Sequence, residues 1–179
     1  GQRLTLDASH RMRYVSWDDG LWGRDGSQVQ FTRNRTRAGL TWRPTGALEL
    51  RAALVNEFFH WMESPTDRPT KPDEVAFEHL SLRWSDTLGI PFAATLGRQN
   101  FMLGDGFLIM DGTPLDGSRT LYVNAARLDC EIQPRHTLTL FALHQPKRDD
   151  LLPIINDQER RLAEYERDIV GISDRKSVV

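Results

Sequence analysis

The chain has little cysteine and lysine and no long apolar run. Its 179 residues contain one cysteine, Cys130, and five scattered histidines without a His-Glu-x-x-His pair. A single thiol forms neither an intramolecular disulfide nor a four-ligand zinc cage, so disulfide-stapled and structural-zinc folds are excluded. The longest apolar stretches are of the size of residues 107–110, whereas a spanning helix needs roughly 18 residues. A transmembrane helix is therefore excluded, whereas spanning β-strands, about ten residues long and half polar, escape hydropathy.

The charge of the chain is almost balanced but unusual in kind. The formal net charge is −2, which argues against a general nucleic-acid binder. Of the 23 basic residues, all but Lys71, Lys147 and Lys176 are arginine. Codon use in a GC-rich genome would give this excess. So would a requirement for planar guanidinium groups, which bind carboxylates and phosphates through paired hydrogen bonds. Composition leaves both explanations open.

Alternation of apolar and polar residues predicts an all-β chain. In residues 3–14, apolar side chains such as Leu4 and Leu6 alternate with polar ones such as Arg11 and Arg13, which is the period of a strand. Strands are predicted at residues 3–14, 28–43, 48–58, 79–84, 91–99, 121–132 and 136–144, with an eighth beginning at 169–172. The one helix-like run is residues 157–165.

The predicted connections alternate between long and short along the chain. This parity is typical of outer-membrane barrels, which have short periplasmic turns and longer outer loops. A soluble sandwich has no reason to follow it. Most predicted strands also exceed the five or six residues usual in globular sheets. The pattern therefore favours an antiparallel, up-and-down transmembrane barrel.

The two faces of the predicted strands differ in chemistry. Aromatic residues near the strand ends indicate interfacial girdles on the apolar face, with caps of a soluble core as the alternative. The aromatic residues are Tyr14, Trp17, Trp42, Phe58, Phe59, Trp61 and Trp84. The opposite face carries an excess of arginine. A guanidinium ladder along a water-filled pore would stabilise a passing anion, although a merely solvated face is the simpler alternative. The candidate pore-lining residues are Arg33, Arg35 and Arg37, with Arg11, Arg13, Arg51, Arg83 and Arg127 as neighbours.

Catalytic motifs are absent from the sequence. There is no Gly-x-Ser-x-Gly elbow and no phosphate-binding Gly-x-x-x-x-Gly-Lys-Ser/Thr loop, and Cys130 has no evident activating partner. Asp-Gly pairs occur at 19–20, 25–26, 105–106, 111–112 and 116–117. Such pairs are typical of turns, with a calcium site as the alternative. We expect a protein that is not an enzyme and that has no cofactor and no metal.

Three short motifs resemble the alginate-export family of outer-membrane porins. They are Gly97-Arg98-Gln99, the segment Gly104-Asp105-Gly106-Phe107-Leu108-Ile109, and Val123-Asn124-Ala125-Ala126-Arg127-Leu128-Asp129. Their order and spacing carry the resemblance, which covers about a fifth of the chain, with looser similarity at residues 3–14 and 33–37. The sequence departs from the family pattern at Phe107, Asn124 and Cys130, where arginine, aspartate and an aromatic residue are expected.

The resemblance implies an eighteen-stranded barrel whose arginine-lined pore passes an anionic polyuronate through the bacterial outer membrane. Lipid, an acidic polysaccharide or other anionic solute, and periplasmic export components are the implied partners. We expect residues 1–173 to be an N-terminal part of such a barrel. The last six residues, 174–179, match a translated sequencing adapter, with a polar tail as the alternative. The rival function is a soluble antiparallel barrel or sandwich that binds carbohydrate or lipid, complete near residue 173.

Overall fold

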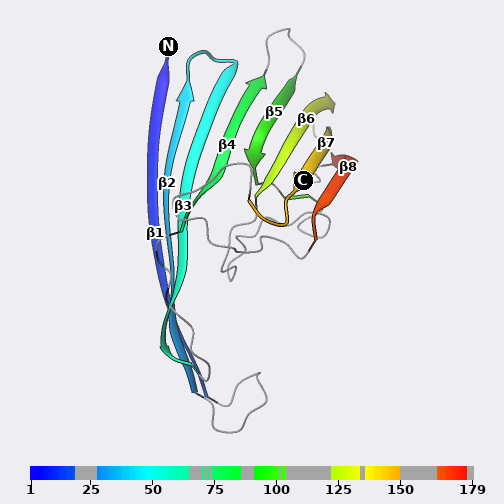
Figure 1. Ribbon diagram of the computed structural model, residues 1–179. Helices are drawn as coiled ribbons and strands as arrows, with labels where there is room; N and C mark the ends of the chain where they lie inside the picture. The colour runs from blue at the N-terminus through cyan, green and yellow to red at the C-terminus, as the bar shows by residue number, and fades with distance from the viewer. Residues whose placement is uncertain are drawn as a thin grey trace.

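In the computed structural model the chain forms one open antiparallel sheet of eight strands (Figure 1). The structure describes residues 1–18, 28–64, 70, 72, 74–85, 91–100, 102–103, 122–133, 136–149 and 165–176. The strands are β1 (Arg3–Asp18), β2 (Gln28–Arg43), β3 (Leu48–Glu63), β4 (Val75–Ser85), β5 (Phe92–Gln99), β6 (Val123–Gln133), β7 (His136–Gln145) and β8 (Arg167–Lys176). No helix occurs among these described residues, and residues 157–164 of the helix-like run lie outside them.

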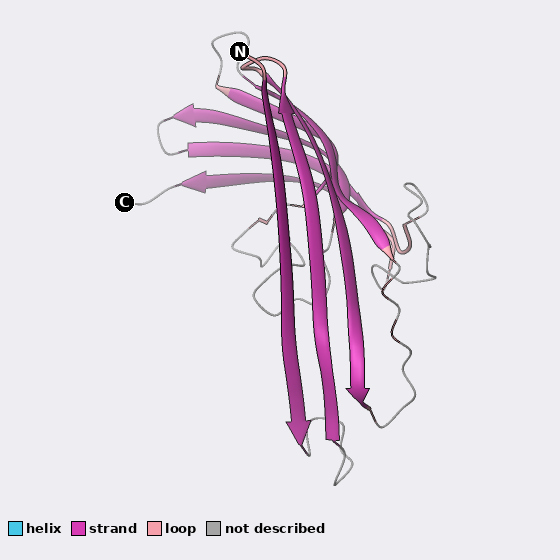
Figure 2. Ribbon diagram, turned by 90° about the vertical axis from the view of Figure 1, so that its left-hand side faces the viewer, coloured by secondary structure: helices cyan, strands magenta, loops and turns pink. Residues whose placement is uncertain are grey.

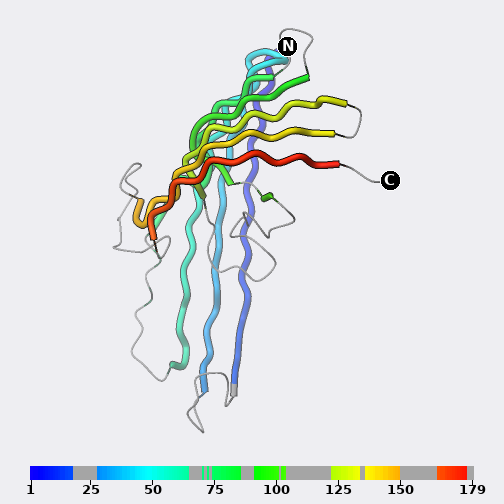
Figure 3. Tube along the Cα trace, turned by 90° about the vertical axis from the view of Figure 1, so that its right-hand side faces the viewer, coloured from blue at the N-terminus to red at the C-terminus, as the bar shows by residue number. Residues whose placement is uncertain are grey.

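Each strand pairs with the next strand along the chain. The order in the sheet is β1 to β8 without a crossover, and β1 and β8 are its two edges, as the colour ramp of Figure 3 shows. This confirms the predicted all-β, up-and-down arrangement. The described strands form neither two packed sheets nor a closed eight-stranded barrel, since β1 and β8 are not paired.

No helix in the described part of the chain is both long enough and apolar enough to cross a membrane.

The first three strands are much longer than the others. β1, β2 and β3 have 16 residues each, about 53 Å at 3.3 Å per residue, and they extend well beyond β4–β8 (Figure 2). β1 and β3 therefore continue past the predicted ends at residues 14 and 58. β4 begins at Val75 rather than at 79, and β8 spans ten residues that include 174–176 of the suspected adapter segment.

The connections follow the predicted parity. Those at one edge of the sheet, residues 44–47, 86–91 and 134–135, are shorter than those at the other, residues 19–27, 64–74, 100–122 and 146–166. We call these two sides of the sheet, at which the strands begin and end, the short-turn edge and the long-connection edge; they are distinct from the edge strands β1 and β8. The N-terminus lies at the short-turn edge, at the top of Figure 1.

The strand register sorts the side chains onto two faces. On one face, which we call the polar face, Arg35 lies opposite Arg11 and Glu57. On the other, the apolar face, Leu40 lies opposite Leu6 and Ala52. Alternation places residues of one strand on the two faces in turn, so the register carries both patterns across the sheet.

The polar face is the buried one. Two clusters of buried apolar side chains lie on it: Leu103, Val123, Ala125, Phe141 and Leu143 in one, and Val55, Ala76 and Tyr122 in the other. Leu103 and Tyr122, which flank β5 and β6 in the chain, pack onto the polar face with these strand residues. The apolar face is exposed, with Leu6 at 72% and Val170 at 84%. This is the reverse of a soluble sheet, which buries its apolar face.

Candidate functional site on the polar face

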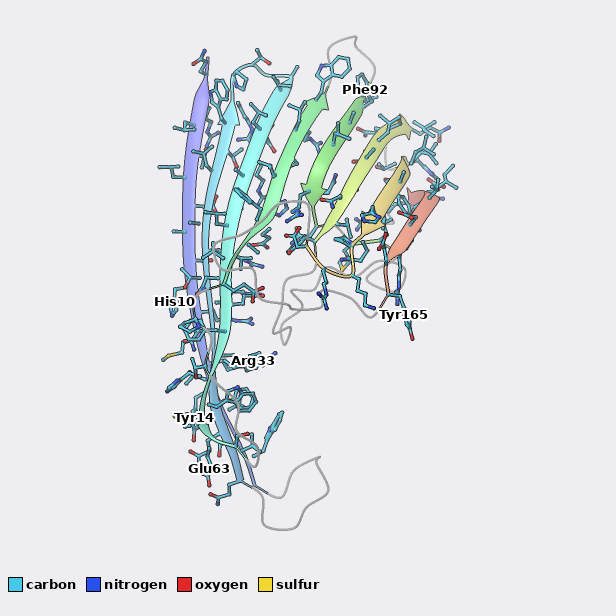
Figure 4. All side chains as sticks on the ribbon, in the orientation of Figure 1. His10, Tyr14, Arg33, Glu63, Phe92 and Tyr165 are labelled. Atoms are coloured by element: carbon cyan, nitrogen blue, oxygen red, sulfur yellow. The ribbon has the colours of Figure 1, made fainter. Side chains whose placement is uncertain are left out.

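Five of the predicted arginines lie together on the long part of the polar face. Arg11 is directly opposite Arg35, Arg13 is directly opposite Arg33, and Arg37 follows on β2. We call these five residues the arginine cluster. Figure 4 shows Arg33 on the side of the sheet opposite to His10 and Tyr14. The three-residue pattern on β2 therefore meets a second row of guanidinium groups on β1.

Two carboxylates and one aromatic ring contact this cluster. Glu78 Oε1 lies 2.7 Å from Arg37 Nη2, and Glu57 Oε1 lies 3.8 Å from Arg35 Nη1. The guanidinium carbon of Arg33 lies 5.2 Å from the centre of the Phe59 ring, within the range of a cation–π contact. Like charges directly opposite each other destabilise a sheet. Within the described part of the chain, five guanidinium groups and the carboxylates of Glu57 and Glu78 thus gather on one part of the polar face, where positive charge attracts anions.

The remaining three predicted arginines form a separate group nearer the short-turn edge. Arg83 of β4 and Arg127 of β6 both lie directly opposite Thr95 of β5. Arg51 of β3 lies in the next row of residues on this face. Arg127 is bound to Asp129, with Nη2 2.8 Å from Oδ1. The row between the two groups carries Asp7, Gly39, Ala53 and His79. The eight arginines are therefore two groups on one face, not a single ladder.

The Gly-Arg-Gln motif has a structural role. Gly97 has φ of 114°, and a Cβ there would collide with the carbonyl oxygen of Leu80. Only glycine adopts this conformation without strain. The next residue, Arg98, is the most deeply buried large side chain of the described part, at 2% exposure. Gln99 Nε2 donates a hydrogen bond of 3.1 Å to the carbonyl oxygen of Ala125.

Arg98 is fixed by a carboxylate that sequence reasoning missed. Its Nη1 and Nη2 each lie 2.6 Å from an oxygen of Asp149. Tyr122 Oη donates to Asp149 over 3.0 Å, and the Tyr122 ring lies 4.5 Å from the guanidinium carbon. Nη1 also donates to the carbonyl oxygen of Phe77. Arg98 therefore links β4 and β5 to Asp149, which follows β7, and its guanidinium group is not exposed for binding a solute.

Three aromatic residues lie on the face opposite to the expected one. Trp17, Phe59 and Trp61 share the polar face with Arg33, because Phe59 is opposite Arg33, Trp61 is opposite Phe31, and Trp17 follows Arg13 by four residues on β1. Their prediction as part of an apolar-face girdle is wrong. Strict alternation from Arg13 and Glu57 would have placed all three correctly.

Other predicted features fall outside the described residues. These include Gly104, Asp105 and Gly106 of the second motif and all five Asp-Gly pairs. Among the residues that the structure does describe, no group of three or more His, Cys, Asp or Glu side chains could hold a metal ion.

Comparisons with known proteins do not assign the chain to a family. No protein-family model, no curated protein and no solved structure matches it. A functional proposal therefore depends on the geometry of the two faces.

Proposed function

We propose that this chain is part of an outer-membrane porin that passes an anionic polysaccharide, such as an alginate-like polyuronate, or other anionic solutes. In this proposal the sheet is a segment of a transmembrane barrel in the bacterial outer membrane. The apolar face contacts lipid and the polar face lines a water-filled pore. The motif resemblance to the alginate-export family supports the same function.

The observation that carries the proposal is the exposure of the apolar face. Leucine side chains on its interior strands are exposed, such as Leu40 of β2 at 39% and Leu96 of β5 at 61%. On the polar face, charged side chains such as Glu78 are buried at 4% exposure. In water such an apolar surface costs roughly 25 cal/mol per Å². In a bilayer it is the surface that an outer-membrane strand presents to lipid.

The apolar surface also crosses the sheet obliquely. On the long-connection side its uninterrupted apolar rows stop at a row of polar residues on β1–β3 (His10, Thr36 and Asn56), past which the rows are mixed, as in Met12, Asn34 and Phe58, and at another polar row on β6–β8 (Asn124, His144 and Asp168). Across β5 and β4, the second row is in register with Ala52 of β3. Ala52 lies four residues from Asn56, toward the short-turn edge. At the short-turn margin of the apolar surface, Trp42 of β2 is in register with Leu96 of β5. The aromatic residue at this margin of β5, Phe92, lies four residues from Leu96 in the same direction.

These offsets correspond to tilted strands crossing a flat slab. Four residues are about 13 Å, and neighbouring strands are about 4.8 Å apart. From β2 to β7 the offset implies a tilt of about 30°, and from β2 to β5 a tilt of about 40°. Spanning barrels tilt their strands by about 35–45°. A bilayer explains both the existence and the slope of this apolar surface, which we call the lipid belt.

The belt also locates the two arginine groups in the proposed pore. Arg11 and Arg35 lie past the polar row that ends the belt on β1–β3, one row further toward the long-connection edge. Four residues of the arginine cluster, Arg11, Arg13, Arg33 and Arg35, would then line a vestibule outside the bilayer, and Arg37, one row to the other side of Thr36, would lie at its boundary. Arg51, Arg83 and Arg127 lie at the level of the belt and would line the pore inside the membrane.

The test has two parts and uses the complete gene product that contains this chain. Expressed with a signal peptide, it should fractionate with the outer membrane and migrate differently on gels before and after heating, as folded barrels do. In planar bilayers, replacing Arg33, Arg35 and Arg37 by Ser should reduce anion selectivity, measured as reversal potential in a salt gradient. Unchanged reversal potentials would refute the role of these arginines.

A change of opposite sign is the matched control. Glu57→Gln removes a carboxylate beside Arg35 and should increase anion selectivity. A soluble product that forms no channel would instead favour the carbohydrate- or lipid-binding module. That alternative buries the apolar side chains, which the open sheet leaves exposed.

A further inference from the structure

Four aromatic rings continue the arginine cluster toward the long-connection edge. Trp17, Phe31, Phe59 and Trp61 lie on the polar face, and we call them the aromatic patch. The ring centres of Phe31 and Trp61 are 4.7 Å apart, and those of Phe31 and Phe59 are 5.5 Å apart. Phe59 and Trp61 are nearly parallel, at 16° and 5.6 Å. The rings therefore form one contiguous apolar surface.

The patch is more than a small core. Phe31 is buried at 4% exposure and holds the three strands together, but Trp17 is 41% exposed. Phe59 and Trp61 are only partly buried. The patch lies past the polar row of His10, Thr36 and Asn56, so it is outside the proposed lipid belt, and it faces away from the apolar side. Membrane anchoring therefore does not account for these rings.

The patch and the arginine cluster are directly connected. Arg33 lies over the Phe59 ring at 5.2 Å and shares a row with Arg13. Arg35 Nη1 makes no hydrogen bond within the described part of the chain; its nearest carboxylate oxygen, on Glu57, is 3.8 Å away.

Aromatic rings beside arginines match one chemical class of ligand. The face of an aromatic ring is weakly negative and attracts the weakly positive C–H groups on the flat side of a sugar ring. A guanidinium group binds a carboxylate through paired, charge-assisted hydrogen bonds. A sugar that carries a carboxylate satisfies both. Neutral sugars would use only the rings, and small inorganic anions only the arginines.

We propose that the aromatic patch and the arginine cluster together form a binding site for uronic acid units of an acidic polysaccharide. Trp17, Phe59 and Trp61 stack on the sugar rings, and Arg33, which lies over the Phe59 ring, binds the carboxylates. The site lies at the long-connection end of the sheet, where in the proposed barrel the polymer would leave or enter the pore. This inference deepens the proposed function by naming the units that are bound and where.

The test is a binding titration with a defined probe. The complete gene product, folded in detergent micelles, is titrated with a hexamer of mannuronic acid, and calorimetry gives the dissociation constant. Trp17→Ala removes the most exposed ring at little cost to packing and should raise the dissociation constant about tenfold, since stacking on one aromatic side chain is worth that much or more. Trp61→Ala should have a similar or larger effect. Trp42→Ala, on the apolar face, is the matched control and should leave binding unchanged.

A second titration separates the roles of the rings and the arginines. Wild type should bind neutral mannohexaose more weakly than the acidic hexamer, and Arg33→Ser should reduce this preference. Trp17→Ala should weaken both. If Trp17→Ala and Trp61→Ala, folded as judged by circular dichroism, bind the acidic hexamer like wild type, the site is refuted and the patch serves only to pack the strands.

The binding result and the pore result can fail separately. Anion-selective channels whose affinity for the hexamer is insensitive to Trp17 and Trp61 would leave the porin standing and remove the site. Ring-dependent binding by a product that forms no channel would keep the site and remove the porin.

Discussion

Removing either partner of the buried Arg98–Asp149 pair should destabilise the sheet more than removing both. The two side chains are 1% and 4% exposed, and both guanidinium nitrogens are 2.6 Å from carboxylate oxygens. Leaving a buried charge without its partner costs about 3–5 kcal/mol. We therefore expect Arg98→Leu and Asp149→Leu each to lower the free energy of unfolding by about that amount.

The double variant distinguishes this reason from a general loss of packing. Arg98→Leu combined with Asp149→Leu leaves neither charge buried, so its cost should be lower than that of either single variant, which corresponds to a coupling energy of at least about 3 kcal/mol. The assay is equilibrium unfolding in urea from detergent or lipid vesicles, followed by tryptophan fluorescence. Replacing Arg127 and Asp129, whose side chains are 27% and 15% exposed, is the control pair and should show a coupling of about 0–1 kcal/mol. Additive single costs at Arg98 and Asp149 would refute the reasoning.

Two further predictions concern the faces and the backbone. Leu40→Arg places a charge in the middle of the proposed lipid belt and should cost about 2–4 kcal/mol of folding free energy in vesicles, whereas Thr41→Arg, the next residue on the polar face, should cost less than about 1 kcal/mol; equal costs would contradict the assignment of the faces. Gly97→Ala should destabilise by more than about 1 kcal/mol in the same unfolding assay, because φ is 114° and a Cβ meets the Leu80 carbonyl. Gly46→Ala, where a Cβ meets nothing within 4 Å, should be nearly neutral, and a similar loss at both glycines would argue against the strain.

Local periodicity was sufficient to predict the strand order and the two faces. Alternation in residues 3–14 and 28–43 determines which side chains share a face, and the register of β1 with β2 confirms it. The long and short connections were visible from the spacing of the turn residues. The end of β1 was predicted too early because residues 17–27, rich in Asp and Gly, indicate a loop, and the end of β3 because its alternation was followed only to Phe58.

What the sequence did not reveal depends on contacts between distant residues. Arg98 and Asp149 are 51 residues apart in the chain, and no periodic signal links them. On β4 the alternation fails at a register shift between Ala53 and Leu54 of β3, and Glu78 and His79 are both buried there. A bulge of this kind leaves no clear pattern in one strand alone. The start of β4 at Val75 was therefore missed.

The central claim is that the apolar face of this sheet contacts lipid, and lipid-borne quenchers test it most directly. Trp42 and Trp84 lie on the apolar face and Trp17 and Trp61 on the polar face. Four variants that each keep one of these tryptophans, with the other three and Trp22 replaced by Phe, would be folded into vesicles of lipids brominated on the acyl chains. Bromine should quench Trp42 and Trp84 strongly and Trp17 and Trp61 little. Equal quenching at all four positions, or stronger quenching at Trp17 and Trp61, would contradict the account.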